Sequence, residues 1–230
     1  MKQNIPKHIV IIPDGNRRWA KEKGLKATLG HKTAAEYNHI ESLITQAKNS
    51  GVKYLSIWAF STENWKREKQ EIKTIFNLIY RLINHFSKDI YKNKIRFKHL
   101  GRKDRIPKKL VQALEKLEQE SKNYSGFNVQ LCLDYGGKDE IIRAVNRAIK
   151  SGKIEINEKE FHEFLDTKNI PEPDLIIRTS GEQRTSGIMP FQSSYAELYF
   201  TPVYFPDFNS QELKKAIEEF QKRQRRFGGS

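Results

Sequence analysis

The order of apolar segments in the 230-residue sequence predicts an α/β fold with a single mostly parallel sheet and helices on both faces. Short runs rich in β-branched and aromatic residues, such as HIVII at 8–12 and KYLSIWAF at 53–60, are typical of buried strands. Between such runs lie longer segments whose apolar residues recur every three or four positions, the period of an amphipathic helix. Strands that alternate with helices in this way favour parallel pairing, because each helix carries the chain back across the sheet.

Each expected element rests on its own residues. Apolar residues from Ile72 and Ile75 onward keep helical spacing, which predicts one long amphipathic helix over 69–91. Gly51 ends the helix that we expect over 31–50, and Pro107 occupies the first turn of another. The expected strands are 8–12, 53–60, 95–100, 127–133, 174–178 and 196–200. The expected helices are 17–23, 31–50, 69–91, 107–121, 138–150, 157–166 and a basic one from Asn209 into the tail.

The length and composition are those of one domain. The chain shows no internal repeat, low-complexity linker or change of composition, so we expect a single unit over 1–230. Its one cysteine, Cys132, excludes a disulfide framework and a cysteine-rich metal site, and favours a reducing cytoplasm. No apolar stretch approaches the roughly 20 residues that span a bilayer. We therefore expect a cytoplasmic protein whose contact with a membrane, if it has one, is peripheral.

The chain is strongly basic, with 42 Lys and Arg against 28 Asp and Glu and a net charge of +14. Such a surplus favours a polyanionic partner, which can be a nucleic acid, an anionic membrane face or a phosphorylated substrate. The sequence carries no RNA-recognition, zinc or helix-turn-helix signature, so we do not expect a nucleic acid. Diphosphate substrates and an anionic membrane explain the surplus equally well.

Polar clusters follow five of the expected strands. In open α/β sheets, ligands bind outside the carboxyl ends of the strands. Five clusters at one edge therefore predict that this edge holds the functional site, although loops after strands are often polar for no functional reason. The clusters are PDGNRRW at 13–19, STENWKR at 61–67, GRKDR at 101–105, DYGGKDE at 134–140 and RTSGEQRTSG at 178–187.

The residue types in these clusters indicate phosphate and metal chemistry. Their arginines can bind phosphate bidentately, and glycines let the backbone approach an anion closely. Asp14 is a hard oxygen ligand suited to Mg²⁺, and Glu197 is a candidate for a second carboxylate. Taken alone, Asp14 is as readily the cap of the helix at 17–23. A P-loop, a GxGxxG turn and a HExxH helix are absent, which excludes the classes that these motifs mark. The anion capacity indicates two phosphorylated substrates or one large one.

Three motifs in order, DGNRRW, FSTENW and RTSGEQR followed by YAELYF, resemble those of the cis-prenyltransferases, the family of undecaprenyl and dehydrodolichyl diphosphate synthases. The resemblance covers roughly residues 7–228. The variants PDGNRRW and SGIMPFQSSYAE look more like archaeal members than typical bacterial ones, which have MDGNGRW. Prenyl chemistry enters only through this resemblance, whereas the residues themselves indicate phosphate, metal and the sheet edge.

The resemblance implies that the chain condenses an allylic prenyl diphosphate with isopentenyl diphosphate, forming a Z-polyprenyl diphosphate and releasing diphosphate. Asp14 and Asn64 are implied to be catalytic, and Asp14 and Glu197 to hold Mg²⁺. A hydrophobic tunnel between the helices and the sheet is implied to hold the growing chain. The implied allylic diphosphate site comprises Gly15, Asn16, Arg17, Arg18, Trp19, His31, Ser61, Trp65 and Arg67.

The resemblance also implies a homodimer with shared sites. The sequence RFG at 226–228 is similar to the arginine-x-glycine ending that reaches across a two-fold dimer in this family. We therefore expect the tail, 221–230, to lie at the dimer interface and to complete the isopentenyl diphosphate site of the other subunit. That site is implied to comprise Arg178, Arg184, Ser186, Arg226 and Gly228.

Two departures from the family pattern stand out. An arginine that many bacterial members carry before the GH motif is Ala27 here, which puts one allylic phosphate contact in doubt. The usual NYGGR is DYGGK at 134–138, which weakens any specific role for Asp134 or Lys138. Two alternatives stay open within the family: a non-catalytic partner subunit, and transfer to a non-isopentenyl acceptor. The presence of Asp14 argues against the first, and the sequence does not specify the allylic primer or the product length.

Overall fold

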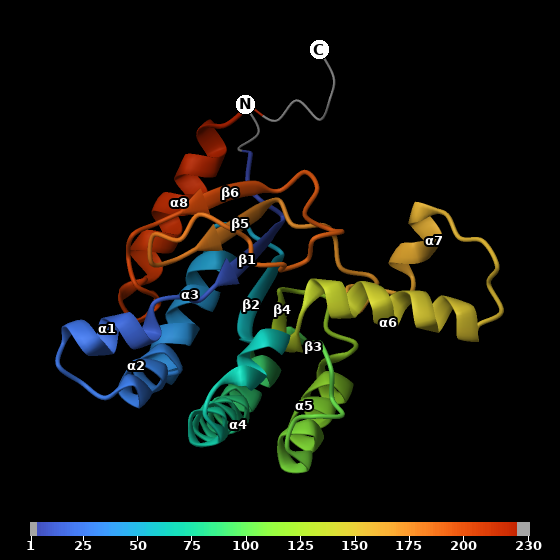
Figure 1. Cartoon of the computed structure of the whole chain (residues 1–230). Helices are drawn as coiled ribbons and strands as arrows, with labels where there is room; N and C mark the ends of the chain where they lie inside the picture. Colours follow the sequence, from blue (N-terminus) through green and yellow to red (C-terminus); the bar gives the residue numbers. More distant parts are fainter. Residues whose placement is uncertain (1–3, 225–230) are drawn as a thin grey trace.

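The computed structural model describes residues 4–224, and at its centre six strands form a sheet in the order β3–β4–β2–β1–β5–β6 (Figure 1). Every pairing between neighbouring strands is parallel, as the alternation of strands and helices predicts. The strands are β1 (His8–Ile12), β2 (Tyr54–Ser61), β3 (Arg96–Leu100), β4 (Asn128–Tyr135), β5 (Leu175–Arg178) and β6 (Glu197–Phe200). The direction of strand order reverses between β1 and β5. Such a reversal opens a crevice at the carboxyl ends of the two strands.

Helices cover the sheet unevenly. Apolar residues of α3, α4, α5 and α8 form one large core with one face of the sheet, while α6 and α7 form a small core of their own to the side (Figure 1). The helices are α1 (Asn16–Glu22), α2 (Ala27–Ala34), α3 (Tyr37–Asn49), α4 (Lys69–Lys92), α5 (Lys108–Ser121), α6 (Gly137–Lys150), α7 (Glu158–His162) and α8 (Ser210–Lys222). Two short 3₁₀ turns follow strands β2 and β6: η1 (Thr62–Lys66) and η2 (Phe205–Asp207).

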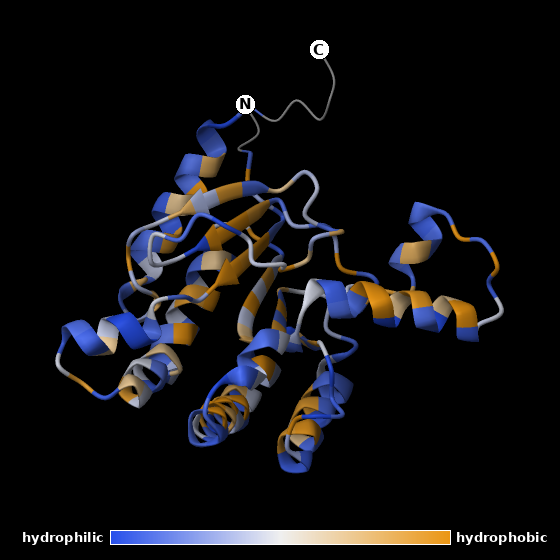
Figure 2. Cartoon of the chain, in the orientation of Figure 1, coloured by the Kyte–Doolittle hydropathy of each residue, from blue (hydrophilic) through white to orange (hydrophobic). Residues whose placement is uncertain are grey.

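The central strands are buried on both faces. In β1, Ile9 and Ile11 join the large core, whereas Val10 and Ile12 face the opposite side and pack with Ile188 of the segment after β5. Figure 2 shows the result as a hydrophobic sheet surrounded by helices with one apolar side. Alternate residues of a strand point to opposite faces, so a continuous apolar run is what a doubly covered parallel strand requires. The predicted α/β class is confirmed.

The prediction of one helix over 31–50 is wrong, because the chain forms α2 and α3 there. Glu36 is extended, with φ −65° and ψ 135°, and separates the two helices. A side chain at Gly30 would place its Cβ 1.9 Å from the carbonyl oxygen of Asn16, so α2 lies directly against the start of α1. Docking of α2 on α1 and of α3 on the sheet requires different axes, and tertiary packing therefore overrides a continuous helical pattern. The helix expected over 157–166 likewise shortens to α7.

Candidate active site

The carboxyl ends of β1 and β5 are joined through Asp14 and Thr179. The Thr179 Oγ1 accepts a hydrogen bond from the Asp14 amide (2.8 Å) and donates one to the Asp14 carbonyl oxygen (2.9 Å). Thr179 is completely buried, so this link fixes the backbone of Asp14 at the point where the strand order reverses. The sequence offered only a polar cluster at 178–187, and the role of Thr179 within it was not predicted.

The Asp14 carboxylate lies between two arginines. Its Oδ2 accepts from Arg178 Nη2 at 2.8 Å, and its Oδ1 accepts from the Gly15 amide at 2.6 Å and from Arg18 Nη2 at 3.4 Å. Burial by itself raises the pKa of Asp14, but the hydrogen bonds from Arg178 and Gly15 and the nearby positive charges outweigh it, so the pKa lies below its usual value. An ionised carboxylate is therefore held at the end of β1, and α1 begins without a side-chain cap.

Gly15 is needed for the chain to leave β1 at this point. Its φ of +91° lies in the left-handed region, and a Cβ there would stand 2.3 Å from the ring of Tyr204 and 2.7 Å from Cβ of Ser180. The turn directs the chain straight into α1, which carries Arg17 and Arg18. A glycine in the DGNRR motif thus allows the carboxylate and the arginines to stand side by side.

Three arginines and two acids form what we call the cradle: Arg18, Arg178 and Arg184 with Asp14 and Glu182. Arg18 donates to Ser180 Oγ (2.5 Å) and to Glu182 Oε1 (3.0 Å), and Glu182 also pairs with Arg184. The Nη1 of Arg178 donates to Ser186 Oγ (2.7 Å) and to the Arg184 carbonyl oxygen (2.6 Å), while its buried Nε has no partner among the described residues. The cradle therefore unites the two loops that the sequence predicted for two substrates, with Glu182 as an unpredicted member.

A second cluster forms around Glu71, in the first turn of α4. Its Oε1 lies 3.1 Å from His31 Nε2 and accepts from Arg67 Nη1 at 3.1 Å, and its Oε2 lies 3.9 Å from Arg17. Burial, with the charge of Arg67 adding to it, lowers the pKa of His31 although Glu71 opposes the shift. Glu71 thus brings together three residues predicted for the allylic site. The sequence signal for it was an acid four residues after Arg67, in the first turn of the expected helix 69–91.

The loop after β2 is held by its own side chains. Ser61 and Asn64 form a capping box, in which the Ser61 amide donates to Asn64 Oδ1 at 3.1 Å. The ring of Trp65 packs against Phe60 and Phe76, with centroids 5.5 and 5.4 Å away, so Trp65 anchors this loop in the core.

An apolar cavity of about 130 Å³ opens beside these clusters. Asn16 and His31 are among its few polar lining residues, and the Oδ1 of Asn16 is buried without a partner among the described residues. The remaining lining comes chiefly from apolar residues of α2, α3, α4, β2 and β4, including Ile40, Ala59 and Ile83. A polar, arginine-rich region therefore adjoins a space suited to an apolar chain. That this space acts as a tunnel for a growing product remains a prediction.

Not every predicted residue reaches the site. Glu197 begins β6, so it lies at the opposite edge of the sheet, three residues or about 10 Å before the carboxyl end of that strand, and it pairs with Arg223 at 2.8 Å. Within residues 4–224, no group of three or more His, Cys, Asp or Glu could hold a metal ion. The buried Trp19 donates its indole N–H to Asp207 (2.8 Å) and so anchors α1. Arg226 and Gly228 lie outside the described residues.

Comparisons with known proteins identify the family of this chain. A prenyltransferase family model described as "Putative undecaprenyl diphosphate synthase" matches residues 12–228. The chain is 47% identical to an isoprenyl transferase of Fusobacterium nucleatum and 43% identical to one of Aquifex pyrophilus, covering 98% of each relative and 100% and 99% of this chain.

Two solved structures have the same fold. Lavandulyl diphosphate synthase from Lavandula x intermedia, in complex with dimethylallyl diphosphate, superposes with a TM-score of 0.92 and 34% identity, covering 97% of this chain and 98% of that one. A "probable undecaprenyl diphosphate synthase" from Campylobacter jejuni superposes with a TM-score of 0.82 and 33% identity, covering 98% and 99%. The two isoprenyl transferases are bacterial, so the expected archaeal likeness has no support.

Proposed function

The chain belongs to the undecaprenyl diphosphate synthase family and is a cis-prenyltransferase that elongates prenyl chains, and we propose that the cradle and the adjoining cavity are where it does so. The observation that carries the proposal is the junction at Asn16 and His31 of an arginine-rich crevice with an apolar cavity. An allylic prenyl diphosphate has that same division into a dianionic or trianionic head and an apolar tail. The head would bind in the cradle, and the tail would enter the cavity.

The allylic diphosphate is assigned to the β1 side of the cradle. Gly15 allows a close backbone approach, Asn16 lines the cavity, and Arg17 and Arg18 supply two guanidinium groups from the same helix start. His31 is held beside them by Glu71, with a pKa that favours the neutral ring. We assign Trp19 a supporting role, since its indole is bonded to Asp207.

The isopentenyl diphosphate is assigned to the β5 side. Arg178 donates to Ser186 Oγ and to the backbone oxygen of Arg184 on the loop after β5, so both side chains and the Arg184 guanidinium lie at one loop that a diphosphate could bind. Arg226 and Gly228 of a second subunit are proposed to complete this site. Ser61, Asn64, Trp65 and Arg67 lie on the loop after β2, from which we propose that they orient the reacting groups.

Mg²⁺ is proposed to bind at Asp14. The carboxylate is ionised, and Mg²⁺ commonly takes one or two carboxylates together with substrate phosphate oxygens, so the donor set fits. When bound, the ion would neutralise charge on the departing diphosphate. Arg18 and Arg178 hold the Asp14 carboxylate in place on both sides. Within one chain Glu197 fits this role poorly, because it pairs with Arg223 at the opposite edge of the sheet.

A homodimer is proposed through α6. This helix projects from the body of the protein (Figure 1), and Figure 2 shows apolar segments along it. Three of its apolar residues, Ile142, Val145 and Ile149, have exposed fractions of 62%, 38% and 63%. A surface of this kind is typical of an interface with a second copy. Light scattering should give a dimer for the wild type and a monomer for Ile142→Glu/Ile149→Glu. A monomeric wild type would overturn this assignment.

Cytoplasmic localisation is proposed from the single cysteine, Cys132, and peripheral contact with an anionic membrane from the charge of +14. None of the helices within residues 4–224 has both the length and the apolar character that a bilayer crossing requires.

The activity is tested by release of diphosphate from isopentenyl diphosphate and farnesyl diphosphate in the presence of Mg²⁺. Extraction of the product and determination of its length, with several allylic primers, would identify the preferred primer. Turnover by the purified chain alone would exclude the non-catalytic partner subunit. Absence of diphosphate release with every primer tested, from a folded protein, would contradict the proposal, and a product without an isopentenyl unit would indicate another acceptor.

A further inference from the structure

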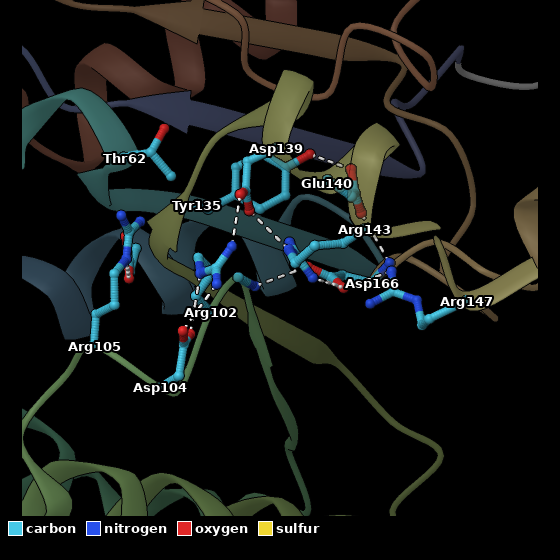
Figure 3. A network of polar contacts seen from close by, with 12 residues as sticks. Thr62, Arg102, Asp104, Arg105, Tyr135, Asp139, Glu140, Arg143, Arg147 and Asp166 are labelled. Carbon is cyan, nitrogen blue, oxygen red and sulfur yellow. Dashed lines mark hydrogen bonds and ion pairs between the residues drawn. The ribbon is translucent and has the colours of Figure 1, made fainter. Parts of the chain in front are cut away.

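Asp134 is a completely buried aspartate in a left-handed conformation, with φ +50°. It occupies the position where the family pattern has the asparagine of NYGGR. Arg105 binds its carboxylate with both arms of the guanidinium, Nε to Oδ2 at 2.9 Å and Nη2 to Oδ1 at 2.5 Å. Arg105 is seen from close by in Figure 3. Asn and Asp tolerate positive φ better than other side chains, but only Asp offers two acceptor oxygens to a guanidinium fork.

The same carboxylate also binds the loop after β2. The indole N–H of Trp65 donates to Asp134 Oδ1 at 2.8 Å, and the guanidinium of Arg105 lies 5.5 Å from the centroid of the Trp65 ring. The ring is therefore fixed at its edge by a carboxylate and over its face by a cation. β4 supplies Asp134 and the β3–α5 loop supplies Arg105, so two elements outside η1 determine where Trp65 lies.

Trp65 is one of three anchors of η1. The Ser61–Asn64 capping box closes the loop at its start, and Arg67 pairs with Glu71 at its end. Between them, Trp65 joins the loop to the rest of the sheet edge. A shift of its ring would carry the neighbouring Asn64 with it, because the two residues share one 3₁₀ turn.

We propose that Arg105 and Asp134 are positioning residues for prenyl transfer, acting through Trp65 on the loop that carries Ser61 and Asn64. The inference rests on the proposed function of that loop. In DYGGK the aspartate offers Arg105 two acceptor oxygens, where the asparagine of the family pattern would offer one. Asp134→Asn, with its amide oxygen at the Oδ1 position, would keep the bonds to Trp65 and Nη2 and lose the one to Nε.

The main test is Arg105→Met, which removes the guanidinium and keeps an unbranched side chain. Because a displacement of about 1 Å at a reacting group can cost about a hundredfold, we expect kcat to fall about ten- to a hundredfold. The KM values for both diphosphates should change less than about threefold, since the phosphate ligands are not moved. Asp134→Asn should retain kcat within about threefold of the wild type.

Arg102→Met is the matched control. Arg102 lies on the same loop and binds Asp104 with two bonds (3.0 and 2.8 Å) and Asp139 with one (2.9 Å), without a bond to Trp65 (Figure 3). It should lower the melting temperature yet leave kcat within about twofold. Equal loss of kcat in both variants would show that Arg105 matters only for stability and would overturn the inference.

A double-mutant cycle separates positioning from stability. Trp65→Phe keeps a ring and removes the N–H, and if Arg105 acts through that indole, Arg105→Met should lower kcat much less in the Trp65→Phe background. The same factor in both backgrounds would overturn the inference. Should Arg105→Met fail to fold, Arg105→Gln, which also removes the guanidinium, takes its place in the cycle. An inactive wild type would refute the proposed function, whereas an active wild type with an unimpaired Arg105→Met would refute only the positioning role.

Discussion

Two arginine-rich regions lie along the carboxyl edge of one sheet, and they differ in how their charges are matched. The cradle sets Arg18, Arg178 and Arg184 against two acids, Asp14 and Glu182, and leaves the buried Nε of Arg178 without a partner among the described residues. The region after β3 and β4, which we call the matched network, sets Arg102, Arg105, Arg143 and Arg147 against Asp104, Asp134, Asp139 and Asp166 (Figure 3).

The difference separates a binding site from a structural one. A guanidinium whose N–H groups are already bonded to carboxylates has few donors free for a phosphate. Where guanidinium groups outnumber carboxylates, a phosphate of a ligand can supply the missing negative charge. The sequence cluster GRKDR at 101–105 predicted a place at the site edge, yet its two arginines are held by aspartates. An arginine at a strand end is therefore not sufficient for an anion site. Whether it can bind an anion depends on whether nearby carboxylates already occupy its N–H groups.

The largest effect is expected at the centre of the cradle. Asp14→Ala should lower kcat about a thousandfold, the scale on which removal of one electrostatic group at developing charge acts. Circular dichroism should show an intact fold. Steady-state diphosphate release in Mg²⁺ checks the rate. A folded variant with nearly normal kcat would mean that Asp14 does not support departure of the diphosphate.

A smaller effect is expected from the cradle arginines. Arg178→Lys and Arg184→Lys should each raise the KM for isopentenyl diphosphate about tenfold and that for the allylic substrate much less, because a lysine cannot replace the planar fork. Initial rates with one substrate varied at a time would measure both constants. If both constants rose equally, the two sides of the cradle would not be separate sites.

In the matched network, apart from the Arg105–Asp134 pair that holds Trp65, the effect should fall on stability. Arg143 binds Asp139 at 2.7 Å and Asp166 with both arms, at 2.7 and 2.6 Å, and its side chain is mostly buried. Arg143→Met should cost about 1–3 kcal/mol of unfolding free energy, because two carboxylates lose a charged partner. Urea unfolding measures that loss, and kcat should stay within about twofold. A large fall in kcat at unchanged stability would contradict the structural role that we assign to Arg143.

The smallest expected effect is the dependence of folding stability on pH in the acid range. Hydrogen bonds from Arg102 lower the pKa of Asp104, and hydrogen bonds from Arg143 and Arg102 outweigh burial and lower that of Asp139. Groups with a lowered pKa stabilise the folded state above their unfolded pKa of about 3.9 and lose this contribution as pH falls through the folded pKa. The difference in unfolding free energy between wild type and Arg102→Met should therefore shrink as pH is lowered below about 4. Urea unfolding between pH 7 and 3 checks this, and a difference that grows in acid would contradict it.

The sequence alone determined the α/β class, the parallel strands and the sheet edge at which the polar clusters gather. Continuous apolar runs such as HIVII predict a strand that is buried on both faces, and the spacing of Ile72 and Ile75 predicts the buried face of a helix. These patterns lie within one segment of the chain, so they can be interpreted without knowing which other segments pack against it. The same locality explains the failure over 31–50, where each half of an apparently continuous helix packs on a different neighbour.

Only the tertiary structure decided which charges meet. Asp14 and Arg178 are 164 positions apart, and no periodicity relates them; the parallel register of β1 and β5 places them in contact. For the same reason Glu197, one motif away from Arg178, lies at the far edge of the sheet, and Asp134 finds Trp65 and Arg105. A side chain's type and spacing fix its chemistry and its face, but its partner depends on how separate elements dock, which is set by the packing of the whole core.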